Sequence, residues 1–79
     1  MVIKVLGPGC ANCGKLDVLA RKAVEQLGLD AEVVKVSDVA DIMGYGVMAT
    51  PALVIDEKVV LAGGVPSLDR VVEVIQRSL

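Results

Sequence analysis

The two cysteines of this 79-residue chain, Cys10 and Cys13, are three positions apart. They follow an apolar, strand-like start and come at the beginning of a long helical pattern. A thiol in the first turn of a helix faces unpaired backbone N–H groups and the positive end of the helix dipole, which favour the thiolate. The second thiol, one turn further on, can form a disulfide with the first. The spacing therefore predicts redox or soft-metal chemistry.

Length and composition limit where this chemistry takes place. Seventy-nine residues are enough for one domain, residues 1–79, with one core. The mean hydropathy of +0.68 is high, but no apolar run reaches the roughly 18 residues that span a bilayer. The first seven residues have no signal-peptide pattern, so we expect a cytoplasmic protein without a membrane span. In that reducing compartment a purely structural disulfide is disfavoured.

Charge and residue types exclude several other functions. A net charge of −2, a pI near 4.9 and a single aromatic residue, Tyr45, argue against nucleic acid as a partner. The chain has no histidine, which excludes mechanisms with a His general base and zinc sites with His ligands. Asp41, Asp56 and Glu57 form no paired arrangement that would support carboxylate acid–base catalysis. We expect a monomer with no resident metal and no bound cofactor.

The hydrophobic pattern predicts seven elements. Four are strands and three are helices: strands 2–6, 31–36, 51–55 and 58–61, and helices from Asn12 to Leu27, from Ser37 or Asp38 through Met43, and from Ser67 to the end. The apolar stripe of the last helix is expected to comprise Leu68, Val71, Val72, Ile75 and Leu79. Cys13 falls three residues before Leu16, on the buried stripe of its helix, whereas Cys10 is presented at the helix start. The order is βαβαββα, and the final hairpin makes the sheet mixed.

This order and three sequence segments resemble the thioredoxin superfamily. The segments are Gly9-Cys10-Ala11-Asn12-Cys13, the run from Gly46 to Asp56 that contains Thr50-Pro51, and the pair Gly63-Gly64. The chain is most similar to the small glutaredoxin-like proteins called redox-active disulfide protein 2, the thioredoxin-like fold-3 group. The resemblance implies an α/β thioredoxin-like fold, with a four-stranded mixed sheet of order 2-1-3-4, two helices on one face and the short helix on the other.

The resemblance also implies a function and a set of site residues. Cys10 would be the nucleophile and Cys13 the resolving thiol of a thiol-disulfide oxidoreductase that reduces or exchanges protein or small-molecule disulfides. Thr50 and a cis Pro51 would form a substrate groove together with Gly63 and Gly64. The expected electron donor is a flavoprotein disulfide reductase.

The sequence leaves the roles of several other residues open. Gly9 and Ala11-Asn12 differ from the Trp and Gly-Pro of thioredoxins, and Lys4 stands where thioredoxins have a buried acid. Lys15 is either a solvated residue or an activator of Cys10, and Tyr45 either hydrogen-bonds near the disulfide or lies on the surface. Met43 and Met48 are expected to fill the core.

One alternative from another class uses the same two thiolates. A metallochaperone module of βαββαβ order would hold Cu(I) or another thiophilic ion between them. That fold ends on a strand and lacks Thr50-Pro51, whereas this sequence predicts a C-terminal amphipathic helix.

Overall fold

The structure, a computed structural model, describes residues 1–9 and 11–79. Seven elements follow one another along the chain: β1 Val2–Leu6, α1 Ala11–Leu27, β2 Glu32–Val36, α2 Val39–Gly44, β3 Ala52–Ile55, β4 Lys58–Ala62 and α3 Leu68–Arg77. This is the predicted order, with element ends that differ by one or two residues. None of the helices within the described residues is both long and apolar enough to cross a membrane.

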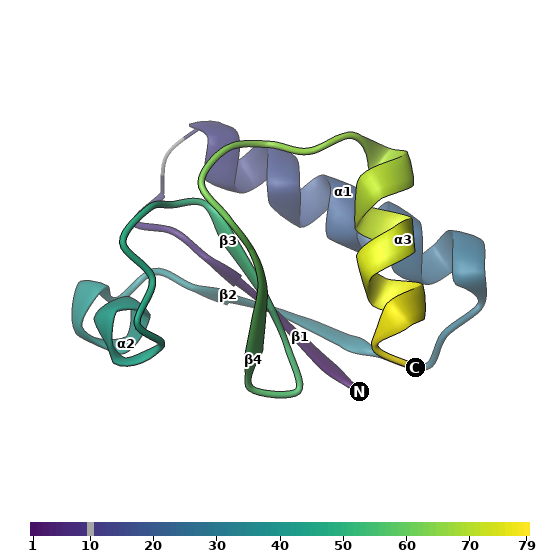
Figure 1. The fold of residues 1–79 in the computed structure, drawn as a ribbon. Helices are drawn as coiled ribbons and strands as arrows, with labels where there is room; N and C mark the ends of the chain where they lie inside the picture. The colour runs from purple at the N-terminus through teal and green to yellow at the C-terminus, as the bar shows by residue number, and fades with distance from the viewer. Residues whose placement is uncertain (10) are drawn as a thin grey trace.

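The four strands form one mixed sheet of order β2-β1-β3-β4, as predicted (Figure 1). β1 pairs with β2 in parallel, because α1 carries the chain back to the end of the sheet at which β1 begins. β3 pairs antiparallel with β1 and with β4. β1 and β3 are therefore the central strands, and all four residues of β3 are buried.

The helices cover both faces of this sheet. α1 and α3 lie side by side on one face, where their apolar stripes pack against Ile3, Val5 and Leu53. α2 covers the other face, where Ile42 packs against Leu6 and Val54. Alternate residues of β1 therefore belong to different cores, and the two-plus-one arrangement of helices is confirmed. The observed βαβαββα order differs from that of the βαββαβ alternative.

Side-chain caps fix where two helices begin. Asp38 caps α2 by accepting a hydrogen bond from the Ala40 N–H at 2.8 Å, which decides between the two predicted caps. Ser67 caps α3 by accepting from the Arg70 N–H at 3.2 Å, as predicted. The predicted stripe of α3 was partly wrong: Val74 is buried, whereas Leu79 is exposed because α3 ends before it.

The turn between β3 and β4 also secures the start of the chain. Asp56 and Glu57 both have positive φ, 47° and 70°, which matches the tight hairpin turn predicted at these residues. The Asp56 N–H donates to the Val2 carbonyl at 2.9 Å, and its carboxylate accepts from the Val2 N–H at the same distance. The hairpin turn is therefore bonded directly to the first residue of β1.

Candidate functional site

Cys13 is placed by α1 at the end of the sheet where β1 ends. It is the third residue of the helix and only 2% exposed, on the same buried stripe as Leu16. Its sulfur is disulfide-bonded, so Cys13 is not a free thiol in this state. The prediction that Cys13 is buried is therefore confirmed. The predicted nucleophile, Cys10, lies outside the described residues.

Gly7 is the residue that makes room for the Cys13 side chain. It follows β1 directly, is buried, and its N–H donates to the Val36 carbonyl at 2.9 Å. A Cβ on Gly7 would overlap the Cys13 Sγ atom and would come within 2.8 Å of the Cys13 Cβ. Such approaches do not occur between real side chains, so the sulfur occupies space that only glycine leaves open.

Strand register brings Pro51 to the same end of the sheet as this pair. Leu6 pairs with Ala52 in the antiparallel ladder, and Gly7, which follows β1, and Pro51, which precedes β3, extend from these paired positions. Pro51 is buried, and the Thr50–Pro51 peptide bond is cis, the isomer that the resemblance implies. Thr50 itself is exposed. An exposed residue beside a buried proline thus lies at the same end of the sheet as Cys13.

Gly63 completes a row across this end of the sheet. Its N–H donates to the Pro51 carbonyl at 2.9 Å, which continues the pairing of β3 with β4. Its φ is +77°, and an added Cβ would come within 3.1 Å of the Ala49 Cβ. Gly64 follows with a φ of +97°, and both glycines are exposed. The packed pair of Cys13 and Gly7 and the bonded pair of Pro51 and Gly63 therefore lie at the same end of the sheet, and we call these four residues the sulfur row.

An apolar groove runs beside the sulfur row along the start of α1. It has a volume of about 520 Å³ and is lined by Ala11, Gly14, Lys15, Val18, Leu19 and Val65. Val65 comes from the loop that follows Gly64, so the groove joins α1 to the β4–α3 connection. Lys15 is exposed and lies at this groove. Lys15 is therefore part of the wall of the apolar groove.

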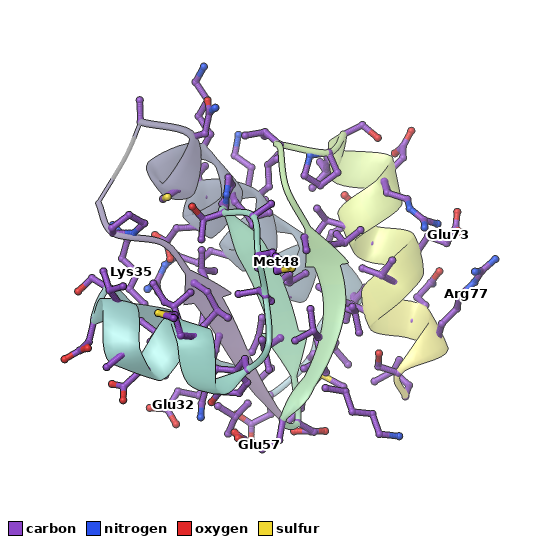
Figure 2. The ribbon with its side chains drawn as sticks, turned by 60° about the vertical axis from the view of Figure 1, so that its left-hand side comes forward. Glu32, Lys35, Met48, Glu57, Glu73 and Arg77 are labelled. Atoms are coloured by element: carbon purple, nitrogen blue, oxygen red, sulfur yellow. The ribbon has the colours of Figure 1, made fainter. Side chains whose placement is uncertain are left out.

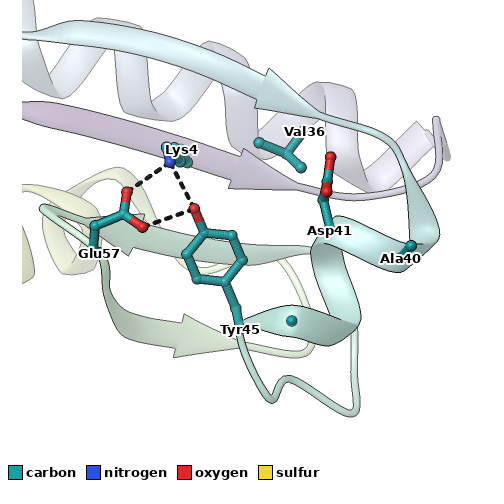
Figure 3. A pocket seen from close by; sticks show the side chains of 7 residues that line it. Lys4, Val36, Ala40, Asp41, Tyr45 and Glu57 are labelled. Atoms are coloured by element: carbon teal, nitrogen blue, oxygen red, sulfur yellow. Dashed lines mark hydrogen bonds and ion pairs between the residues drawn. The ribbon is translucent and has the colours of Figure 1, made fainter.

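A second pocket, of about 690 Å³, lies on the opposite face of the sheet under α2 (Figure 3). At its centre the Lys4 Nζ donates to the Tyr45 hydroxyl and to the Glu57 Oε1, both at 2.6 Å. The Tyr45 hydroxyl donates in turn to the Glu57 Oε2 at 3.1 Å. We call these three residues the lysine cluster. Although this pocket is the larger of the two, its residues offer no nucleophile comparable with a thiol.

Hydrogen bonds within the lysine cluster shift the pKa values of Lys4 and Glu57 in opposite directions. The hydrogen bond to Glu57, followed by the one to Tyr45, raises the pKa of Lys4 above its ordinary value. The same bond from Lys4, followed by the one from Tyr45, lowers the pKa of Glu57. Each group favours the ionised form of the other. The ammonium and the carboxylate therefore remain charged across the neutral pH range.

The structure answers two further sequence expectations. Tyr45 does hydrogen-bond, but the partners that the structure gives its hydroxyl are Lys4 and Glu57. Met43 and Met48 were expected in the core, which was wrong: both are exposed, Met48 completely. Met43 lies on the solvent side of the short helix α2, and Met48 lies in the loop before Thr50.

Sequence reasoning missed Gly7 and Glu57. Gly7 carried a usable signal, since a glycine directly between a strand and a cysteine pair marks a close approach of the helix that follows. Glu57 was assigned only to a turn. Its bond to Lys4 joins residues 53 positions apart, and no local pattern reveals such a pair.

Comparison with known proteins covers the whole of this region. Residues 1–76 match the family model described as "Thioredoxin domain". A protein named thioredoxin from Methanocaldococcus jannaschii is 41% identical over 73 residues, which are 92% of this chain and 84% of that protein. A protein named thioredoxin from Methanothermobacter thermautotrophicus is 37% identical over 75 residues, which are 95% and 97%.

Proposed function

The chain belongs to the thioredoxin family and is, in general terms, a thiol-disulfide oxidoreductase; we propose that Cys10 and Cys13 are its reacting pair. The observation that carries this proposal is the sulfur row. A buried, disulfide-bonded Cys13 lies against Gly7, at the end of the sheet that also holds a buried Pro51 and two exposed glycines. Cys10 is the only other cysteine of the chain.

In the proposed reaction the reduced protein attacks a substrate disulfide. The Cys10 thiolate forms a bond to one substrate sulfur, the substrate S–S bond breaks, and the leaving sulfur takes up a proton. Cys13 then loses its proton and attacks the Cys10 sulfur, which releases the second substrate thiol. The substrate gains two electrons and two protons, and the protein ends with a disulfide. A flavoprotein disulfide reductase is the proposed donor that returns it to the dithiol.

The substrate is proposed to be an extended segment of a disulfide-containing protein. Thr50 is exposed directly before Pro51, the residue that precedes β3, so its backbone groups are available to pair with such a segment, and Gly63 and Gly64 allow close approach. The apolar groove at Val18 and Val65 then suits an apolar side chain next to the substrate cysteine. Small disulfides would be reduced too, but without these contacts.

The order of elements favours this function over metal transport. The metallochaperone alternative requires a βαββαβ domain, whereas the elements follow the order βαβαββα around a sheet of order β2-β1-β3-β4. Within residues 1–9 and 11–79, no three His, Cys, Asp or Glu side chains gather in a way that could hold a metal ion.

Trapping of the intermediate tests the proposal. Cys13→Ser, reduced and mixed with an oxidised protein such as insulin, is expected to accumulate a mixed disulfide through Cys10 because the resolving thiol is absent. Cys10→Ser is the matched control and should trap nothing. If Cys13→Ser traps no adduct while Cys10→Ser still reduces insulin, the assigned roles are wrong.

A further inference from the structure

The lysine cluster links three separate parts of the chain. Lys4 lies in the middle of β1, Tyr45 ends α2, and Glu57 lies in the β3–β4 turn. The Lys4 ammonium is also 5.4 Å from the centre of the Tyr45 ring, close enough for a cation–π contact. The three hydrogen bonds form a closed triangle (Figure 3). The cluster therefore fixes the position of Tyr45 relative to the central strand.

Tyr45 stands at one end of the segment that leads to Thr50. Between them Gly46, Met48 and Ala49 are exposed, and Val47 is half-buried against the core under α2. At the other end the Pro51 carbonyl is bonded to the Gly63 N–H. The segment is thus held at Tyr45, at Val47 and at the hydrogen bond between Pro51 and Gly63, and its course depends on these anchors.

The lysine cluster and Cys13 lie on opposite faces of the sheet. Lys4 belongs to the α2 side of the sheet, whereas its neighbours Ile3 and Val5 face the core under α1 and α3. Cys13 is carried by α1, on that opposite side. Lys4 therefore bonds to Tyr45, at the start of the segment that leads to Thr50, and to Glu57, on the face of the sheet opposite the helix that carries the sulfur.

We propose that Lys4, Tyr45 and Glu57 are positioning residues that hold the segment 46–50 in place for an extended protein substrate, without acting on the thiol pair. This inference rests on the proposed function, because it assigns the segment a substrate-binding role. A preformed segment binds without having to be ordered first, so loss of the cluster weakens substrate binding more than it slows the chemical step.

Two conservative variants test this proposal. Tyr45→Phe removes only the hydroxyl and keeps the ring, and Glu57→Gln removes the charge and keeps the size. Glu73→Gln is the matched control, because Glu73 also forms ion pairs, with Arg70 and Arg77, but lies on α3 (Figure 2). The readouts are kcat and KM for insulin with dithiothreitol as reductant, the rate with hydroxyethyl disulfide, and the rate of alkylation of Cys10 by iodoacetamide.

For Tyr45→Phe and Glu57→Gln we expect KM for insulin to rise about three- to tenfold, the range of one lost hydrogen bond. kcat, the rate with hydroxyethyl disulfide and the alkylation rate should stay within about twofold of the unsubstituted protein, and Glu73→Gln should change none of them. An unchanged KM in both variants, or an equal loss with the small disulfide, would overturn the proposal. If the unsubstituted protein reduces neither disulfide, the proposed function fails, and this inference fails with it.

Discussion

The Cys13 side chain lies directly against the backbone of Gly7, in the space that a side chain at position 7 would occupy. Gly7 cannot easily retreat, because its N–H is bonded to the Val36 carbonyl and it directly follows Leu6, which is paired with Ala52 in the sheet. The end of β1 thus forms a wall for the buried sulfur. The depth of the sulfur below the surface is set by a glycine that itself takes no part in the chemistry.

A methyl group at position 7 should therefore be costly. Gly7→Ala is expected to destabilise the oxidised protein by about 1–3 kcal/mol, the usual range for overpacking a filled site. The reason is that either α1 or the end of β1 has to move away from the new Cβ. Urea unfolding of the oxidised variant, followed by circular dichroism, measures this change.

Gly14→Ala is the matched control for this change. Gly14 follows Cys13 inside α1, and an added Cβ there meets nothing within 4 Å. Because glycine inside a helix is less favourable than alanine, this variant should be more stable by about 0.5–1 kcal/mol. If Gly7→Ala proves as stable as Gly14→Ala, the contact with Cys13 does not restrict position 7.

The apolar groove should contribute to the binding of protein substrates. Val65→Ser removes part of its wall and is expected to raise KM for insulin about fivefold, which corresponds to about 1 kcal/mol of lost apolar contact. Val59→Ser is the control, because Val59 is 39% exposed, similar to the 37% of Val65, but lies on β4 outside the groove. Equal effects of the two substitutions on KM would show that the groove does not contact the substrate.

The ion pair between Lys4 and Glu57 predicts a pH-dependent stability. The pKa of Glu57 is lowered from its ordinary 4.5, by the Lys4 hydrogen bond first and the Tyr45 hydrogen bond second. A carboxylate with a lowered pKa in the folded state stabilises the protein above its unfolded pKa and loses that contribution as the pH falls through the folded value. The contribution is modest, because the Glu57 side chain is 66% exposed.

Urea unfolding of the unsubstituted protein and of Glu57→Gln at neutral pH and near pH 3 checks this expectation. The unsubstituted protein should be the more stable of the two at neutral pH, and the difference in free energy of unfolding should shrink in acid. A difference that stays constant over this range would contradict the assignment of the lowered pKa to this ion pair.

The sequence contained most of the information on the fold. Apolar periodicity and punctuation by Gly28, Gly44 and Ser67 are local features, and they were enough to place every helix and strand within one or two residues. The mixed sheet followed from one further fact, the tight turn at Asp56 and Glu57. The burial of Cys13 was also predictable, because helical spacing places it on the stripe of Leu16.

The parts that could not be predicted depend on contacts between distant segments. Lys4 meets Tyr45 and Glu57 only after the sheet and α2 have assembled, across 41 and 53 positions of sequence. The two methionines were assigned to the core from their residue type, but Met43 lies about 100° around α2 from the buried Ile42, and Met48 lies in a loop. Residue type alone gave no indication of either outcome.

The central claim, that Cys10 is an activated nucleophile, is tested most directly by alkylation. The reduced protein is treated with iodoacetamide from about pH 5 to pH 10, and mass spectrometry identifies the modified residue. We expect Cys10 to react first, with a pH–rate profile whose midpoint lies below about pH 8.5, the ordinary pKa of a free cysteine thiol. Cys13 should react slowly because it is buried. If both cysteines react at similar rates with midpoints at or above that value, Cys10 is not an activated nucleophile and the proposed mechanism is wrong.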